Sequence, residues 1–85
     1  MIEFEYTIKD DLGIHARPAG MLVKTAKELD SEITISKGEK SASVAKLIAI
    51  MGLGIKHGDK IKITINGGDE ADSERVMRKF FEENL

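Results

Sequence analysis

Two segments of this chain alternate apolar and polar residues, and this alternation most restricts the folds open to it. In residues 2–9, Ile, Phe, Tyr and Ile alternate with Glu, Glu, Thr and Lys, and residues 60–65 alternate Lys or Thr with Ile. A period of two is expected of a β-strand with one buried and one wet face. A sheet that is wet on one side is typically antiparallel, and its other face needs a covering layer. The alternation therefore predicts an α+β protein.

Helical spacing appears between these strands. The apolar positions of a helix predicted over about 16–29 lie three and four residues apart: Ala19, Leu22, Val23, Ala26 and Leu29. Pro18 suits the first turn of this helix, where a missing N–H costs nothing. A final helix is predicted after Asp69, a plausible N-cap, and is expected to bury Val76, Met77 and Phe80.

The middle of the chain completes the order of elements. Ile33 and Ile35 mark one short strand and Ala42 and Val44 mark the next, so that residues 37–40 join them as a hairpin. The run 46–53 is apolar at nearly every position, and we predict that it forms a short helix. We therefore expect one domain over residues 1–85 with the order βαββαβα, in which three helices cover one face of a four-stranded antiparallel sheet.

Composition limits the class of protein. The 85 residues contain no cysteine and two distant histidines, so neither a disulfide framework nor a structural metal site is expected. The start of the chain has no basic and apolar leader, and no run is long enough to span a membrane. We expect a cytoplasmic protein. The net charge of −2 and the scarcity of aromatic residues argue against nucleic acid as a partner.

Residues 13–20, Gly-Ile-His-Ala-Arg-Pro-Ala-Gly, place an imidazole and a guanidinium two residues apart where the first helix is predicted to begin. An imidazole is a nucleophile near neutral pH, and the donors of a guanidinium match the oxygens of a phosphoryl group. The first N–H groups of a helix also favour an anion. We interpret His15 and Arg17 as a phosphorylation site; the alternative is that His15 is a loop residue that only caps the helix.

The octapeptide 13–20 closely resembles the active-site loop of the HPr family, the histidine-containing phosphocarriers of the bacterial phosphoenolpyruvate:sugar phosphotransferase system. Residues 47–55, Leu-Ile-Ala-Ile-Met-Gly-Leu-Gly-Ile, are similar to the second motif of that family, at the family's spacing. The resemblance covers essentially the whole chain. It implies an open-faced sandwich with strand order 1-4-2-3, a topology that residue spacing alone does not predict.

The resemblance also implies a function. His15 would accept a phosphoryl group on Nδ1 from phosphorylated enzyme I, ultimately from phosphoenolpyruvate, and pass it to enzyme IIA domains in sugar uptake, while Arg17 neutralises the phosphoryl charge. Such a protein transfers phosphoryl groups stoichiometrically, without a cofactor, and is not a complete enzyme by itself. We expect a monomer.

Two surfaces are candidates for partner binding. Arg17, Gly20, Lys24 and Lys27 fall on one side of the first helix, where they are either a docking surface for acidic partners or solvated charges. Pro18 lies among them. In the second motif Ile50 and Leu53 are expected to be buried, which leaves an exposed apolar patch. With the glycine that follows it, this patch comprises Leu47, Ile48, Met51 and Gly54.

The chain departs from the family at two positions. Many members from Gram-positive bacteria of low GC content carry a regulatory serine just before the second helix, and here that residue is Lys46. Ser41 and Ser43 fall in a predicted strand, so we do not transfer the regulatory role to them. Leu12 stands where the family usually has a small polar residue near the histidine. His57 lies in a turn and is given no role.

Two other functions are compatible with the sequence. In the first, phosphorylation at His15 controls binding of a regulatory module to a target outside sugar transport. In the second, the domain binds a ligand or nucleic acid without covalent chemistry, which the acidic pI and the aromatic-poor sheet disfavour. Identifying the proteins that take the phosphoryl group separates a transport carrier from a regulatory module.

Overall fold

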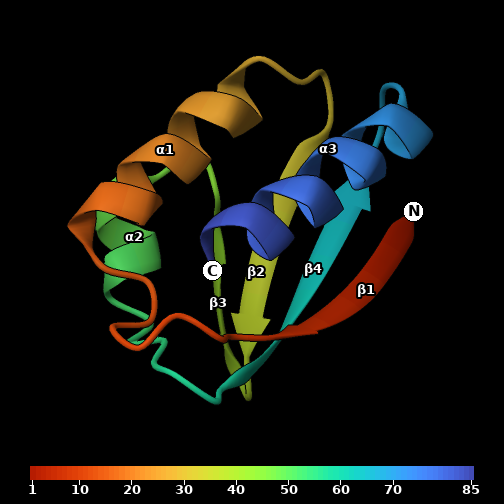
Figure 1. Cartoon of the computed structure of the whole chain (residues 1–85). Helices are drawn as coiled ribbons and strands as arrows, with labels where there is room; N and C mark the ends of the chain where they lie inside the picture. The colour runs from red at the N-terminus through yellow and green to blue at the C-terminus, as the bar shows by residue number, and fades with distance from the viewer.

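The computed structural model describes residues 1–85 and contains four strands and three helices. In chain order they are β1 (Ile2–Thr7), α1 (Ala16–Lys27), β2 (Glu32–Lys37), β3 (Lys40–Ser43), α2 (Leu47–Met51), β4 (Lys60–Asn66) and α3 (Glu70–Asn84). The predicted order βαββαβα is confirmed. Figure 1 shows the chain from its red N-terminus to its blue C-terminal helix.

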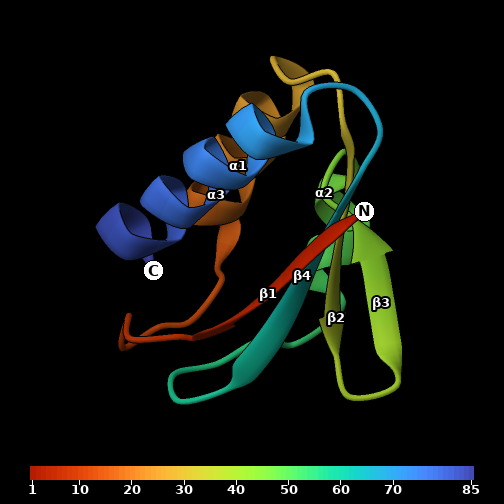
Figure 2. The same ribbon diagram turned by 90° about the vertical axis from the view of Figure 1, so that its right-hand side faces the viewer.

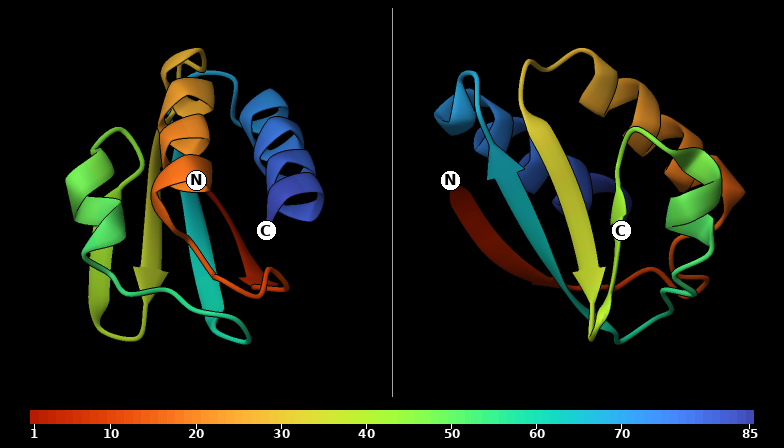
Figure 3. Two further views of the ribbon diagram at one scale, coloured as in Figure 1. Left: turned by 60° about the vertical axis from the view of Figure 1, so that its left-hand side comes forward. Right: turned by 180° about the vertical axis from the view of Figure 1, so that it is seen from behind.

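The strands form one antiparallel sheet in the order β1-β4-β2-β3. The central strand β4 pairs with both β1 and β2, so that Ile63 stands opposite Phe4 on one side and Ile35 on the other. All three helices lie on the same side of this sheet (Figure 3, left), and the view along its edge in Figure 2 shows its other face uncovered. The open-faced sandwich implied by the family resemblance is therefore confirmed.

The hydrophobic core is one cluster between the sheet and the helices. It contains 20 buried apolar residues. Three of them are on β4, namely Ile61, Ile63 and Ile65, and each of these three is at most 1 % exposed. The largest side chain that is fully buried is Phe81, whose ring centroid lies 5.4 Å from that of Tyr6. Burial raises the pKa of Tyr6, with a smaller contribution from Glu82, and the Tyr6 hydroxyl donates to the Phe81 carbonyl at 2.9 Å.

The structure corrects details of the predicted elements. The first helix ends at Lys27 rather than at residue 29, because Glu28 and Leu29 donate to carbonyls three residues back and tighten the chain into a turn. Val76 is only half-buried, because the side of α3 that carries it faces an open groove beside α1. Phe81, which the sequence did not predict as a core residue, is fully buried on the inward face of α3, together with the predicted Met77 and Phe80.

The uncovered face of the sheet is polar. Lys60 lies 3.7 Å from Glu5, and Lys62 lies 3.7 Å from Glu3, on neighbouring strands. This face carries charged and hydroxyl side chains with no exposed aromatic ring, so it lacks the stacking platform of a sheet that reads RNA. None of the three helices is long and apolar enough to cross a membrane.

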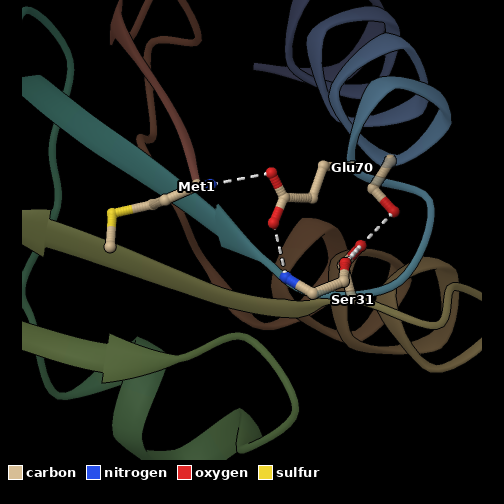
Figure 4. A network of polar contacts seen from close by, with 5 residues as sticks. Met1, Ser31 and Glu70 are labelled. Atoms are coloured by element: carbon tan, nitrogen blue, oxygen red, sulfur yellow. Dashed lines mark hydrogen bonds and ion pairs between the residues drawn. The ribbon is translucent and has the colours of Figure 1, made fainter.

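A network of polar contacts ties the turns at the end of the sheet far from His15 (Figure 4). The Ser31 hydroxyl donates to the Gly67 carbonyl and is 2.7 Å from the Ser73 hydroxyl oxygen, while Glu70 accepts from the Gly67 amide. The Met1 amino group lies 2.9 Å from the Glu70 carboxylate. This pairing, followed by the Gly67 hydrogen bond, holds the pKa of Glu70 below its usual value.

Candidate phosphorylation site

A tight turn between β1 and α1 positions His15. The Gly13 amide donates to the Asp10 carbonyl at 3.0 Å, and the Asp10 side chain accepts from the Leu12 amide at 2.8 Å. Gly13 has a φ of +67°, and a Cβ there would lie 2.6 Å from the Cα of Lys56. Only glycine fits this close approach of two backbones, so the turn and the chain it rests on hold the histidine in place.

His15 is the N-cap residue of α1, with an extended backbone at φ −108° and ψ −176°. Its carbonyl accepts the first helical hydrogen bond from Ala19, at 3.0 Å, but its side chain makes no capping hydrogen bond. The alternative that His15 serves only to cap the helix therefore lacks its defining contact. The imidazole belongs to the residue that begins α1, a helix end whose first backbone N–H groups favour an anion.

The side chains of His15 and Arg17 line one open cavity of about 220 Å³. The sequence predicted this pairing, because the two residues flank the helix start. Pro18, a predicted partner-binding residue, also lines this cavity. The sequence did not predict the other lining residues, which are Asp10, Met21, Glu83 and Asn84. Glu83 and Asn84 come from the end of α3, and no local pattern indicated that this helix returns to the histidine.

The predicted basic surface is present on α1. Arg17, Lys24 and Lys27 are exposed, and none of them forms an ion pair within the chain. Gly20 is half-buried between them. Pro18 is buried, so its contribution to this surface is limited to the wall of the cavity.

The predicted apolar patch is exposed as expected. Ile48 is 80 % exposed, Met51 40 % and Leu47 37 %, whereas Ile50 and Leu53 are buried. The short helix α2 lies beside the first turns of α1 in Figure 1 and in both views of Figure 3, so the two helices that carry the patch and the basic residues are neighbours. The exposed residue Gly54, with a φ of +64°, follows them.

The other residues singled out in the sequence do not line the cavity. Lys46 is the N-cap residue of α2, and its side chain makes no capping bond. Ser41 and Ser43 are in β3, as predicted. His57 is exposed in a turn, with Nδ1 3.2 Å from the Lys9 carbonyl oxygen. Leu12 is 71 % exposed and lies three residues before His15, the N-cap of α1.

The fold and the site define a class of protein, namely small α+β proteins that present a histidine at the start of the first helix next to an arginine. Residues 2–83 match the family model described as "PTS HPr component phosphorylation site". The chain belongs to the HPr family of phosphocarrier proteins, which work within the phosphotransferase system.

Individual relatives agree with this assignment. The chain is 35 % identical over 85 residues to the phosphocarrier protein HPr of Mycoplasma genitalium, covering 99 % of this chain and 97 % of that protein. The structure is similar to that of a mycoplasma histidine-containing phosphocarrier protein, with a TM-score of 0.92, 32 % identity and coverage of 96 % of this chain and 93 % of the other. An HPr of Thermoanaerobacter tengcongensis also has a TM-score of 0.92 and 32 % identity, covering 98 % and 93 % of the two chains.

Proposed function

We propose that His15 is the residue that carries the phosphoryl group. The observation that supports this most directly is a histidine at the N-cap of α1 whose ring makes no capping bond and shares a cavity with Arg17. Phosphorylated enzyme I, charged from phosphoenolpyruvate, is the proposed donor. Enzyme IIA domains are the proposed acceptors.

The transfer forms one bond to phosphorus and breaks another. The lone pair of a His15 ring nitrogen, Nδ1 by the family resemblance, attacks the phosphorus, and the bond from phosphorus to the donor protein breaks. The second transfer reverses these roles, because His15 is then the leaving group. The Arg17 guanidinium and the first amides of α1 offset the negative charge of the phosphoryl oxygens as they pass.

Two carboxylates in the cavity favour a reactive carrier. Asp10 and Glu83 line the same space as His15 and Arg17, so a phosphoryl group there meets negative charge as well as positive. A carrier must not bind its phosphoryl group too strongly, since each gain in stability of the phosphohistidine is lost from the next transfer. The mixture of positive and negative charge in the cavity therefore suits a phosphoryl group that is held only briefly before it is transferred.

We propose that both partners dock on one surface around the histidine. It combines the basic side of α1 with the exposed apolar patch of α2, and its exposed or half-buried members are Arg17, Gly20, Lys24, Lys27, Leu47, Ile48, Met51 and Gly54. Pro18 contributes the wall of the cavity next to this surface. Cations steer acidic partners, while the apolar residues supply contact area. Because donor and acceptor use overlapping contacts, each complex must be short-lived.

The proposed setting follows from the same chemistry. A carrier charged from phosphoenolpyruvate acts where that metabolite is made, so we propose a cytoplasmic site of action for this domain of residues 1–85. It would work as a monomer, because His15, Arg17 and the apolar patch all belong to one chain.

Intact mass measurement tests the proposal. Purified protein is incubated with phosphoenolpyruvate, Mg²⁺ and bacterial enzyme I, beside His15→Ala and the matched control His57→Ala. We expect an acid-labile gain of one phosphoryl group in the wild type and in His57→Ala, and none in His15→Ala. Labelling that persists in His15→Ala would contradict the assignment of the residue.

The acceptor is tested in a second step. Phosphorylated protein is separated from enzyme I and mixed with purified enzyme IIA domains, and loss of its phosphoryl mass is followed over time. Transfer to an enzyme IIA domain supports a role in sugar uptake. Stable phosphoprotein with altered binding to another target would favour a regulatory module instead.

A further inference from the structure

One backbone segment, residues 54–59, supports several parts of the molecule at once. The Gly58 amide donates to the Ile8 carbonyl and the Ile8 amide donates to the Asp59 carbonyl, both at 2.9 Å, which joins the segment to the end of β1. At its other end the segment continues directly from α2 through Leu53. It therefore connects the apolar patch with the strand that leads to the histidine loop.

The loop that carries His15 rests on the same segment. The Ile14 amide donates to the Ile55 carbonyl at 3.1 Å, and the Gly13 backbone lies directly against Ile55 and Lys56. Ile14 and Ile55 are both buried, so this contact is fixed by the core as well as by the hydrogen bond. A displacement of residues 55–56 must carry the residues just before His15 with it.

Lys37, at the end of β2, holds this segment from the opposite side. Its Nζ donates to the Gly54 carbonyl at 2.9 Å and lies 2.8 Å from an Asp59 carboxylate oxygen. The same Asp59 oxygen accepts from the Lys56 amide at 2.8 Å. One lysine and one aspartate thus make three contacts that close the segment into a fixed shape.

We propose that Lys37 and Asp59 are positioning residues for phosphoryl transfer, because they hold the 54–59 segment on which both the His15 loop and the α2 patch depend. Neither side chain lines the cavity at His15, so they act through the backbone of residues 54–56. This inference rests on the proposed function of His15. It adds that the relative placement of the histidine and the docking patch is set by a polar clamp on the far side of the segment.

The physical consequence is a change in geometry. Phosphoryl transfer between two proteins requires the donor and acceptor nitrogens to be in line while the docking patches are in contact, and a misplacement of about 1 Å is enough to cost roughly 100-fold in rate. Without the clamp, the chain from Gly54 to Asp59 keeps its backbone bonds to Ile8 and Ile14 but loses its tie to the hairpin β2–β3. The histidine and the patch then no longer share a rigid support.

The variants are Lys37→Met, Lys37→Arg and Asp59→Asn. Methionine keeps much of the lysine's length without its charge, whereas arginine keeps a cationic donor. Lys60→Met is the matched control, because Lys60 also pairs with a carboxylate, Glu5 at 3.7 Å, but on the open face of the sheet. All four variants are first checked for folding by thermal melting, and kinetics are measured well below the lowest midpoint.

The primary measurement is phosphoryl transfer from enzyme I as kcat and KM for the carrier. We expect kcat/KM to fall about tenfold in Lys37→Met and in Asp59→Asn. Lys37→Arg should keep most of the wild-type kcat/KM, and Lys60→Met should keep all of it. Wild-type kinetics in Lys37→Met, with only a lower melting temperature, would show that the clamp is purely structural and overturn the proposal. If Lys37→Met does not fold, Asp59→Asn decides by the same criteria.

A second measurement does not depend on phosphorylation. Amide and imidazole chemical shifts of the unphosphorylated variants report the surroundings of residues 13–17 directly. We expect shifts in Lys37→Met at Gly13, Ile14 and His15, and none there in Lys60→Met. Unchanged chemical shifts in Lys37→Met would overturn the positioning role. If the shifts change but the wild-type protein accepts no phosphoryl group from enzyme I, the proposed function is disproved and the structural role of Lys37 and Asp59 still holds.

Discussion

At the scale of single residues, Arg17 and Lys24 are both cations on α1, but they stand at different distances from the chemistry. Arg17 lines the cavity with His15, whereas Lys24 is exposed two turns further along the helix. A guanidinium offers several donors in a fixed fork, which a lysine at the same position lacks. The two residues should therefore affect different kinetic constants.

We predict that Arg17→Ala lowers kcat for transfer from enzyme I by on the order of 100-fold, since a positioned donor to the transition-state charge is lost. Arg17→Lys should recover part of this loss because the charge remains. Lys24→Ala should raise KM with little change in kcat, because docking is weakened and the reacting atoms are untouched. Equal losses of kcat in Arg17→Ala and Lys24→Ala would contradict these separate roles.

Gly13 and Gly20 form a second residue-scale contrast. We predict that Gly13→Ala lowers the free energy of unfolding by about 1–3 kcal/mol, because its φ is +67° and a methyl group would overlap the backbone at Ile55. Gly20→Ala is the control: its position in α1 leaves nothing within 4 Å of a new methyl group, and alanine favours helix. Urea denaturation measures both; a stable Gly13→Ala protein would argue against the close backbone contact.

At the scale of elements, α2 is amphipathic over only five residues. Its inward face is Ile50, which is completely buried, and its outward face is dominated by Ile48. Because so short a helix gains little from its own hydrogen bonds, its stability comes from packing of the buried face. The exposed isoleucine is then available for partners.

We predict that Ile48→Asp changes the free energy of unfolding by less than about 0.5 kcal/mol, as is usual for exposed sites. It should raise KM for enzyme I and for the enzyme IIA acceptor, because an acidic, polar residue replaces an apolar contact. Ile50→Val, the core counterpart, should cost about 0.5–1.5 kcal/mol of stability and leave KM nearly unchanged. Denaturation and transfer kinetics on both variants test this division of the helix; an unaltered KM in Ile48→Asp would remove it from the docking surface.

At the scale of the whole molecule, two carboxylates link stability to pH. The hydrogen bond from Lys37 and then that from the Lys56 amide hold the pKa of Asp59 below its usual value, and Glu70 is held below its own by the Met1 amine and the Gly67 amide. A carboxyl with a depressed folded pKa stabilises the protein fully above its unfolded pKa of about 4. That contribution is lost as the pH falls through the lower, folded value.

We therefore predict that the free energy of unfolding falls as pH is lowered from about 5 towards 3, the range in which the unfolded carboxyls gain protons. Asp59→Asn should be less stable than the wild type at neutral pH, and its stability should depend less on pH in the acid range. Glu39→Gln is the control, because Glu39 is exposed in the hairpin turn and forms no ion pair. Urea titrations at several pH values measure the slopes; parallel curves for Asp59→Asn and the wild type would disprove the linkage.

Much of this molecule follows from short-range patterns in its sequence. The period-two alternation around Phe4 and Ile63 predicted strands with one wet face, because successive side chains of a strand point to opposite sides. His15 and Arg17 were predicted as a pair because they are two residues apart, and Ile48 and Ile50 were assigned correctly to outside and inside. In each case the interacting atoms are neighbours in the chain, so local spacing determines their placement.

Only the tertiary structure decided what depends on distant segments. Strand spacing left the order β1-β4-β2-β3 open, and only the family resemblance implied it. Glu83 reaches the His15 cavity and Phe81 enters the core because α3 crosses back over β1, and Lys37 meets Asp59 because β2 ends beside the turn before β4. These contacts join residues 22 or more positions apart. Local periodicity cannot predict such contacts, because they form only when the sheet register brings the distant segments together.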